Sequence, residues 1–337
     1  RSTHRRGRSS ARRRPGSSVL AVELLEAAAA GDEQAFVQLT APLRRRLHAH
    51  CYRMLGSVHD ADDALQETML RAWRGIGRFE PRAELSSWCY RIATNVCLRM
   101  IEQRGRWDAA SVDGFLQPYP DVLFEPATPE REAERRETIG LAFVTAMQLL
   151  PPRQRAALVL RDVLGWSARE TADLLGVSVA AANSALQRAR DRVERERQEG
   201  TLARAHRPAD ERTERAVMRR FVEAWEAVDI ERLTMLLADD ALMTMPPEPM
   251  HVVGPAEIGG FFSTVPMDGR LDLIRLRPTR ANGQPALAAF VQEEPGAPFR
   301  GYGIMVFALD GDRVGGITGF AGYPELFPVF ELPSELG

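Results

Sequence analysis

The chain has 337 residues, of which 45% are hydrophobic and 27% charged, as in ordinary globular proteins. Its formal net charge of −2 is unevenly divided: residues 1–200 carry 31 Arg against 26 acidic residues (+5), and residues 201–337 carry 13 against 20 (−7). No apolar run approaches the ~20 residues of a membrane helix, so no membrane association is expected. The cysteines, Cys51, Cys89 and Cys97, are odd in number and lack CxxC spacing, which argues against a disulfide framework and a zinc site and favours thiols in a reducing cytoplasm.

Residues 1–18 form a basic, low-complexity tail that we expect to be disordered. Residues 19–105 read as an all-helical domain. Asp32 is the expected N-cap of a helix that Gly56 ends, a second helix covers residues 60–73, and a third starts at Ser86 or Ser87.

The third helix carries Arg91, Asn95 and Arg99 at intervals of four, which forms a polar and basic row. Aromatic residues, among them Phe79 and Trp88, lie nearby in the sequence. Such a row beside aromatic rings suits single-stranded nucleic acid, because bases stack on rings while phosphates meet Arg. The alternative is an ordinary solvated face with a core Trp.

Residues 106–135 are rich in Pro and acidic residues, so they are expected to form an extended linker. Residues 136–198 form a second all-helical domain. There, a helix over residues 153–164 precedes a capping box of Ser167 and Glu170, a stop at Gly176 and a new N-cap at Ser178. Two helices joined by a short glycine turn are typical of the helix-turn-helix motif.

The last helix of this domain is predicted to turn Ala182, Leu186, Ala189 and Val193 inward. Small, hydrogen-bonding or basic side chains then lie on its other faces, and they suit base edges and phosphates. They are Asn183, Ser184, Gln187 and Arg188. A plain helical hairpin with a solvated face is the alternative interpretation.

Residues 199–210 mark a boundary, and residues 211–337 have the pattern of an α+β cone. Two helices, at 213–228 and 230–237, come first, and a short helix at 256–262 interrupts the strands. A hairpin is expected at the DGDR sequence of residues 310–313. The expected strands cover residues 241–245, 271–278, 286–292, 302–309 and 314–320.

The runs DADDALQETMLRAWRGIGRF and LSSWCYRIATNVCLRMI, followed by the helix-turn-helix block, resemble regions 2 and 4 of extracytoplasmic-function sigma-70-type factors. The resemblance implies binding to core RNA polymerase and promoter DNA. It assigns core-polymerase binding to Asp63, Gln66 and Glu67. It assigns the −10 element to Phe79, Arg82, Arg91, Asn95 and Arg99, and the −35 element to Asn183, Ser184, Gln187 and Arg188.

Residues 211–337 resemble SnoaL-like domains of the nuclear transport factor 2-like superfamily, and the runs ANGQPA and LFPVFELP resemble sigma factors that carry this extra domain. Enzymes of this fold enclose an apolar pocket with one acid or base. Residues that can line such a pocket here are Trp225, Met243, Met245, His251, Tyr302 and Phe320. His251 alternatively is a solvated loop histidine, Asp239 and Asp240 are surface charges at a helix end, and the Met and aromatic positions are core.

The sequence therefore predicts a cytoplasmic sigma factor that needs no cofactor or metal, has no catalytic residue, and is regulated in cis by its C-terminal domain. The acidic linker is expected to thread through the polymerase. A stand-alone helix-turn-helix regulator is one rival interpretation, which leaves the region 2 helices unexplained. The other rival is a small-molecule enzyme or ligand sensor fused to a DNA-binding arm. An unidentified small ligand of the C-terminal domain is a further candidate partner.

Overall fold

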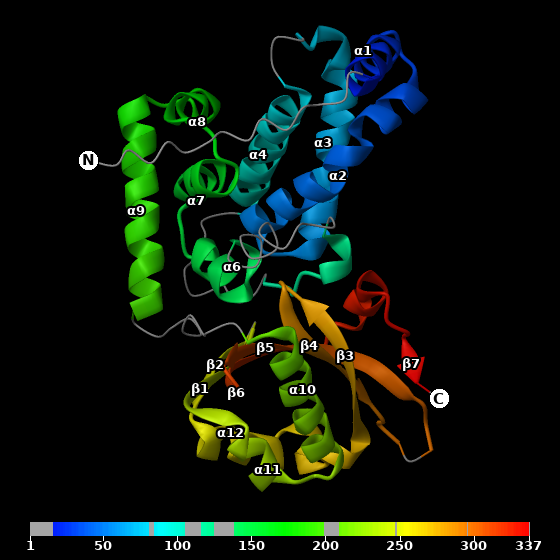
Figure 1. Cartoon of the computed structure of the whole chain (residues 1–337), viewed down its shortest axis with the longest axis vertical. Helices are drawn as coiled ribbons and strands as arrows, with labels where there is room; N and C mark the ends of the chain where they lie inside the picture. The colour runs from blue at the N-terminus through cyan, green and yellow to red at the C-terminus, as the bar shows by residue number, and fades with distance from the viewer. Residues whose placement is uncertain are drawn as a thin grey trace, which may run out of the picture.

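The computed structural model describes residues 16–80, 84–104, 116–124, 138–198, 209–246, 248–294 and 296–336. Figure 1 shows helices in the N-terminal two thirds of the chain above a C-terminal domain with a curved sheet. The predicted order of all-helical parts followed by an α+β domain is confirmed.

The first helical part, which corresponds to region 2 in the resemblance above, packs its helices around a buried apolar core. Asp32 caps α2 by accepting from the Ala35 amide, and Gly56 ends it in the left-handed conformation, as predicted. The third predicted helix starts at Leu85, one residue before the predicted Ser86, and Glu84 provides no side-chain cap. The helices are α1 (Gly16–Ala29), α2 (Glu33–Leu55), α3 (Val58–Gly75) and α4 (Leu85–Gln103).

The second helical part, region 4, contains the predicted helix-turn-helix. Ser167 and Glu170 form the capping box of α8, Gly176 ends that helix at φ 64°, and Ser178 accepts from the Ala181 amide at the start of α9. The first predicted helix is α7, and it continues as a π-helical turn over Val159–Val163. The helices are α6 (Leu141–Gln148), α7 (Pro152–Leu158), α8 (Ala168–Leu175) and α9 (Val179–Gln198).

The C-terminal domain is one mixed sheet in the order β2-β1-β6-β5-β4-β3, with β7 beside β5. Neighbouring strands are antiparallel except β1 and β6, which are parallel. The strands are β1 (Leu237–Met245), β2 (Glu248–Val253), β3 (Ile274–Ala281), β4 (Gln284–Val291), β5 (Phe299–Asp310), β6 (Arg313–Ala321) and β7 (Glu335–Leu336), and the helices are α10 (Glu211–Glu226), α11 (Ile230–Met235) and α12 (Pro255–Thr264).

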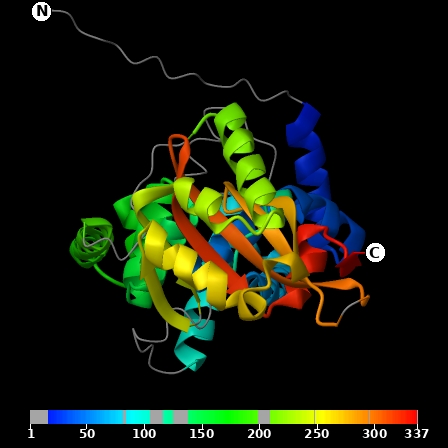
Figure 2. The ribbon, with the colours of Figure 1, turned by 90° about the horizontal axis from the view of Figure 1, so that it is seen from below.

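Both faces of this sheet are buried, but by different partners. Because side chains alternate along a strand, Phe307 points to one face and Val306 to the other. The Phe307 face packs against Phe221 and Trp225 of α10 and Phe262 of α12, and Figure 2 shows these helices covering the sheet. The opposite face belongs to the same hydrophobic cluster as regions 2 and 4.

Some local predictions in this domain are wrong. Residues 248–253 form the strand β2, which the Pro-rich sequence before it concealed, so His251 lies on a strand rather than in a loop. Asp239 and Asp240 lie in β1, exposed, rather than at a helix end. Val228, the last residue of the helix predicted over residues 213–228, lies after the end of α10 with φ 53° and is exposed.

Within the described ranges, no helix is both long enough and apolar enough to cross a membrane. The same residues contain no group of three or more His, Cys, Asp or Glu side chains arranged to hold a metal ion. Cys51, Cys89 and Cys97 are buried free thiols. Burial raises the pKa of the Cys89 thiol to about 12.

Candidate functional site

The basic row of α4 lies on the surface of region 2, as predicted. Arg91, Asn95 and Arg99 are all exposed on this helix. Phe79 packs against Trp88 with ring centroids 5.2 Å apart, beside the first turn of α4. The predicted −10 residue Arg82 lies outside the described residues. The rest of the set thus gathers around one helix.

The predicted −35 residues lie on the outer surface of α9. Asn183, Ser184, Gln187 and Arg188 are exposed, while Ala182, Leu186, Ala189 and Val193 are buried beneath them. Gln187 donates to the Asp191 carboxylate at 2.8 Å, one turn further along the helix. A helix with a buried apolar stripe and a free polar face can enter a major groove.

The predicted polymerase-binding residues share one face of α3, since they are spaced at i, i+3 and i+4. Asp63 and Gln66 are exposed, and Glu67 is half-buried and accepts from Arg71 at 2.5 Å. Gln66 also lines a groove of about 420 Å³ between α2 and α3. This groove has an apolar floor and polar rims, and its walls are Glu33, Phe36, Val37, Arg44, Asp62, Leu65, Gln66, Met69, Leu70 and Trp73.

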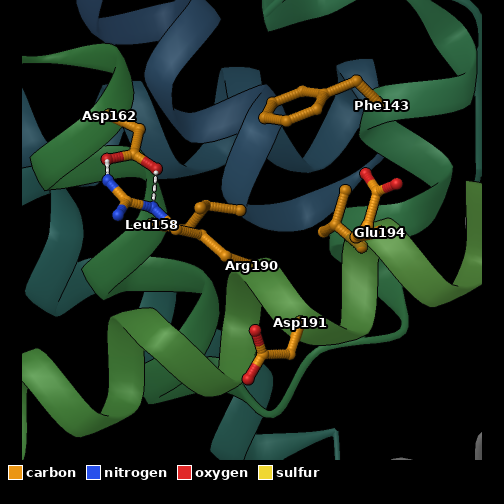
Figure 3. Close-up of a pocket in the computed structure, with 7 residues that line it drawn as sticks. Phe143, Leu158, Asp162, Arg190, Asp191 and Glu194 are labelled. Atoms are coloured by element: carbon orange, nitrogen blue, oxygen red, sulfur yellow. Dashed lines mark hydrogen bonds and ion pairs between the residues drawn. The ribbon is translucent and has the colours of Figure 1, made fainter.

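A second groove of about 320 Å³ lies in region 4, between α6, α7 and α9 (Figure 3). Arg190 donates to both oxygens of Asp162, at 2.9 and 2.6 Å. Phe143 and Leu158 provide apolar walls. Because the Arg190 charge is already paired, this groove has no free cation to hold an anionic ligand.

Regions 2 and 4 are packed directly against each other. Arg155 of α7 is buried and donates to the carbonyls of Met54, Gln148 and Leu150. Desolvation lowers its pKa to about 9. In return, Gln148 Nε2 donates to the carbonyl of Arg53 at 3.2 Å. Since a buried polar group without a partner costs about 1–3 kcal/mol, these reciprocal bonds hold the two regions in one arrangement.

The same arrangement brings the α4 row close to the helix-turn-helix. Hydrogen bonds from Ser167 lower the pKa of the Glu170 carboxyl, and the positive charge of Arg91 lowers it further. Glu170 belongs to α8 and Arg91 to α4. The predicted −10 face of α4 therefore lies near α8.

The tip of the β3–β4 hairpin inserts between these regions. Asn282 and Gly283 both have positive φ, as a two-residue type I′ turn requires. Asn282 is fully buried, and its amide nitrogen donates to Tyr52 Oη of α2 at 3.0 Å and to the Ile139 carbonyl at 2.8 Å. Its side-chain oxygen accepts from the Tyr119 amide, and its own amide donates to the Tyr119 carbonyl, both at 2.8 Å.

The residues beside Asn282 extend these contacts. The Gly283 amide donates to Asp121 Oδ1 at 2.8 Å, and Arg280 bridges Asp121 and Glu214. Gln284 Oε1 accepts from the Leu141 amide at 2.9 Å. The residue before α6 has no capping side chain, so this hairpin residue caps α6 of region 4.

The linker segment 116–124, which the hairpin contacts, is also bound to region 2. Gln117 donates from its backbone to the Gly56 carbonyl, and Gln117 Oε1 accepts from Ser57 Oγ and the Val58 amide, all at 2.9 Å. Tyr52 Oη donates to the Gln117 carbonyl at 2.8 Å. Gln117 therefore satisfies the Val58 amide at the start of α3, the helix that carries the predicted polymerase-binding residues.

The proposed pocket-lining residues of the C-terminal domain do not lie together. Trp225 and Met243 are buried on the helix-covered face of the sheet, whereas Phe320 is buried on the opposite face. His251 and Tyr302 are exposed. Met245 is half-buried beside Gly319.

The sequence did not indicate the residues where the C-terminal hairpin and the linker meet regions 2 and 4, a place called the junction below. No contact was predicted for Asn282, Tyr119, Gln117 or Arg155, and no role was predicted for His48. One usable signal was the Asn-Gly pair at 282–283, which is a strong hairpin signal when strand-forming residues flank it. The partners of Asn282 are 143 to 230 residues away in sequence, so no local pattern pointed to them.

Fold and site together define a promoter-recognition protein of the sigma-70 type with a fused α+β domain. Residues 39–106 match the Sigma-70 region 2 family, residues 140–193 match Sigma-70, region 4, and residues 218–315 match the SnoaL-like domain. The crystal structure of the extracytoplasmic function sigma factor SigJ of Mycobacterium tuberculosis has a similar fold. Its TM-score is 0.59 at 24% identity, over 86% of this chain and 98% of that chain.

Sequence relatives with higher identity belong to the same class of sigma factor. The chain is 40% identical over 316 residues to the ECF RNA polymerase sigma factor SigG of Mycobacterium tuberculosis, covering 88% of this chain and 84% of that protein. It is 36% identical over 173 residues to SigM of the same organism, over 51% of this chain and 82% of that protein. The chain belongs to the extracytoplasmic-function (ECF) RNA polymerase sigma factors, and it directs promoter-specific transcription initiation.

Proposed function

We propose that the C-terminal SnoaL-like domain regulates this sigma factor in cis, by clamping the linker and holding regions 2 and 4 in a closed arrangement. The observation that carries the proposal is the insertion of Asn282. Its polar groups are bound by region 2 at Tyr52, by the linker at Tyr119, and by Ile139, which leads into region 4. The proposed regulation is mechanical and needs neither a catalytic residue nor a cofactor.

The spacing of the promoter elements indicates that regions 2 and 4 must move apart to bind both of them. The −10 and −35 elements are named for positions that differ by about 25 base pairs, which span roughly 85 Å of B-DNA at ~3.4 Å per base pair. In this structure α4 contacts α7, and α7 contacts α9. Packed helices lie about 8–10 Å apart, so the two DNA-reading helices are separated by roughly 20 Å. The closed arrangement therefore does not fit both elements at once.

The length of the linker also limits how far region 4 can move away from region 2. Thr138 follows Phe124 by 14 residues, which reach at most about 50 Å when fully extended. From Arg104 to Thr138, however, the chain can extend to roughly 120 Å. Segment 116–124 must therefore leave region 2 before region 4 can reach a distant element.

Specific side chains are proposed for each contact, as the sequence predicted. Core polymerase is bound by Asp63, Gln66 and Glu67. The −10 element is bound by Phe79, Arg82, Arg91, Asn95 and Arg99. The −35 element is read by Asn183, Ser184, Gln187 and Arg188. Replacing Asn183 or Gln187 by Ala should change sequence preference by about 1–3 kcal/mol if each makes a good base contact. Replacing Arg99 should weaken binding to all promoters alike. These functions place the protein in the cytoplasm.

The test of the clamp is run-off transcription with purified core polymerase and the full chain. Asn282→Gly is the sharpest variant, because glycine keeps the positive φ and removes only the side chain. We expect this variant to initiate more transcripts than the wild type at limiting sigma concentration. Asp312→Ala, in the separate β5–β6 turn, is the matched control and should leave the yield unchanged. Equal yields from the wild type and Asn282→Gly would contradict the clamp.

One observation favours a second function, a small-ligand sensor. Trp225 is only 2% exposed, and its indole Nε1 has no hydrogen-bond partner among the described residues. A buried N–H of this kind can donate to a small polar ligand or a water molecule. Trp225→Phe should then abolish any ligand-dependent change in tryptophan fluorescence and in transcription. Unchanged ligand responses in that variant would remove Trp225 from this function.

A further inference from the structure

A continuous series of contacts leads from the C-terminal hairpin to the helix that binds polymerase. Asn282 holds the Tyr119 backbone through two hydrogen bonds, one to its side-chain oxygen and one from its backbone amide. Tyr119 Oη lies 2.8 Å from His48 Nδ1 on α2, and His48 Nε2 lies 3.1 Å from Asp62 Oδ1 on α3. His48 thus makes polar contacts to both the linker and α3, one through each ring nitrogen.

The two sides of the His48 ring are held differently. On the Nδ1 side, the ring lies 2.8 Å from the buried Tyr119 hydroxyl. Because the Asp62 carboxylate at Nε2 favours the Nε2–H tautomer, Nδ1 accepts from Tyr119. On the Nε2 side, Asp62 Oδ1 lies within ion-pair distance at 3.1 Å, and its carboxylate is far more exposed than the ring. The linker therefore holds one side of the ring, and the other side of the ring meets Asp62.

Asp62 ends the series at the surface. Its side chain is 60% exposed, whereas that of His48 is 6% exposed. Asp62 precedes Asp63 and lies one helical turn before Gln66, and both Asp62 and Gln66 line the groove between α2 and α3. A carboxylate at this position is available to a basic surface of the polymerase.

We propose that His48 is a positioning residue that couples the docked hairpin to polymerase binding, by holding Asp62 toward α2 while Tyr119 is in place. When the hairpin releases the linker, Tyr119 leaves His48, and Asp62 becomes free to pair with polymerase. The proposal rests on the cis regulation proposed above and names its route into region 2. Gln117, which caps α3, is a neighbouring contact that leaves with the same linker.

The first test is a double-mutant cycle on the affinity of the full chain for core polymerase. Tyr119→Phe removes only the hydroxyl that reaches His48 and keeps the ring that stacks on Phe124. Alone, Asn282→Gly should tighten binding by about 10-fold, within the usual range of coupling between sites. Combined with Tyr119→Phe, the same substitution should change the affinity by less than about 3-fold.

Variants of His48 separate positioning from simple packing. His48→Gln places an amide oxygen and nitrogen with nearly the spacing of the ring nitrogens, so it should restore most of the response to Asn282→Gly that His48→Leu loses. His50→Gln is the matched control, since His50 is buried on the same helix but contacts Thr94 within region 2. The control should keep the full response.

Ring-nitrogen NMR gives a readout that packing alone does not move. The His48 signals, assigned with His48→Gln, should report the Nε2–H tautomer in the wild type and a mixture of tautomers in Asn282→Gly. If Asn282→Gly leaves polymerase affinity unchanged, the cis regulation itself fails. If it tightens binding equally with Tyr119 or Phe at 119, regulation stands but the route through His48 is wrong.

Discussion

The two faces of the C-terminal sheet are buried to similar extents but by different parts of the chain. Phe307 on one face packs against Phe221 of the same domain, with ring centroids 4.9 Å apart. Phe320 on the other face is 1% exposed and belongs to the cluster that includes regions 2 and 4. The helix-covered face stabilises the C-terminal domain itself, and the opposite face attaches this domain to regions 2 and 4. The difference teaches that attachment can change while the domain itself stays folded.

The largest effect is expected on the helix-covered face. Phe307→Ala removes a fully buried ring and should lower the free energy of unfolding of the C-terminal domain by about 3–5 kcal/mol. Thermal unfolding followed by circular dichroism measures this loss. A domain that keeps its wild-type melting temperature would show that the aromatic cluster is not its core.

The matched substitution on the opposite face is Phe320→Ala. It should weaken the attachment to regions 2 and 4 by about 2–4 kcal/mol, because the cluster that buries this ring includes residues of both regions. Limited proteolysis within residues 199–208 should become faster, while the C-terminal fragment that remains stays folded. A fragment that unfolds as readily as that of Phe307→Ala would remove the distinction between the faces.

Acid should also act on the attached state. Burial lowers the pKa of His48 below 6.5, and the facing Asp62 carboxylate only partly offsets this; Tyr119 is the other titratable group that contacts the ring. Neutral His48 therefore favours docking above pH 6.5, and docking weakens as pH falls below that value, by up to about 1.4 kcal/mol per pH unit. The rate of limited proteolysis of the full chain, compared between pH 8 and pH 5.5, measures this weakening of docking.

His50 provides the control for the acid effect. Desolvation by burial lowers its pKa to about 3, so acid also destabilises region 2 itself as pH falls below 6.5. His48→Gln should flatten the pH dependence of docking, while His50→Gln should flatten only that of region 2 unfolding. A docking profile that His48→Gln leaves unchanged would assign the acid effect to other groups.

The smallest effect should come from the turn after α10. Val228 is β-branched, exposed and held at φ 53°, a conformation that disfavours it by about 1–2 kcal/mol. Val228→Gly should relieve this strain and raise domain stability by up to about 1 kcal/mol, net of the greater flexibility of the unfolded chain. Docking and transcription should be unchanged. A loss of stability would show that contacts of the valine side chain outweigh its backbone strain.

Local patterns were sufficient for much of the fold. Asp32, Gly56, Ser167 and Gly176 each act through neighbours a few residues away, so capping rules located the ends of their helices. The strand β2 was missed because the prolines before it argue against regular structure. The exposed faces of α3, α4 and α9 followed from helical periodicity.

The junction was beyond such patterns. Asn282 is a turn residue by its local sequence, yet its partner Tyr119 is 163 residues away and its partner Tyr52 is 230 residues away. Which surface of the C-terminal domain meets regions 2 and 4 depends on shape and on long-range hydrogen bonds. His48 was indistinguishable in sequence from His50, although only His48 reaches the linker.

The distance between regions 2 and 4 in solution tests the central claim most directly. Spin labels at Glu102→Cys on α4 and Arg169→Cys on α8 occupy exposed sites, and the native cysteines are buried. Pulsed electron paramagnetic resonance should give one short distance for the free wild-type chain, and a longer one with core polymerase and promoter. The free Asn282→Gly variant should show both. A long distance in the free wild type, or a short one retained on the promoter complex, would contradict the closed arrangement.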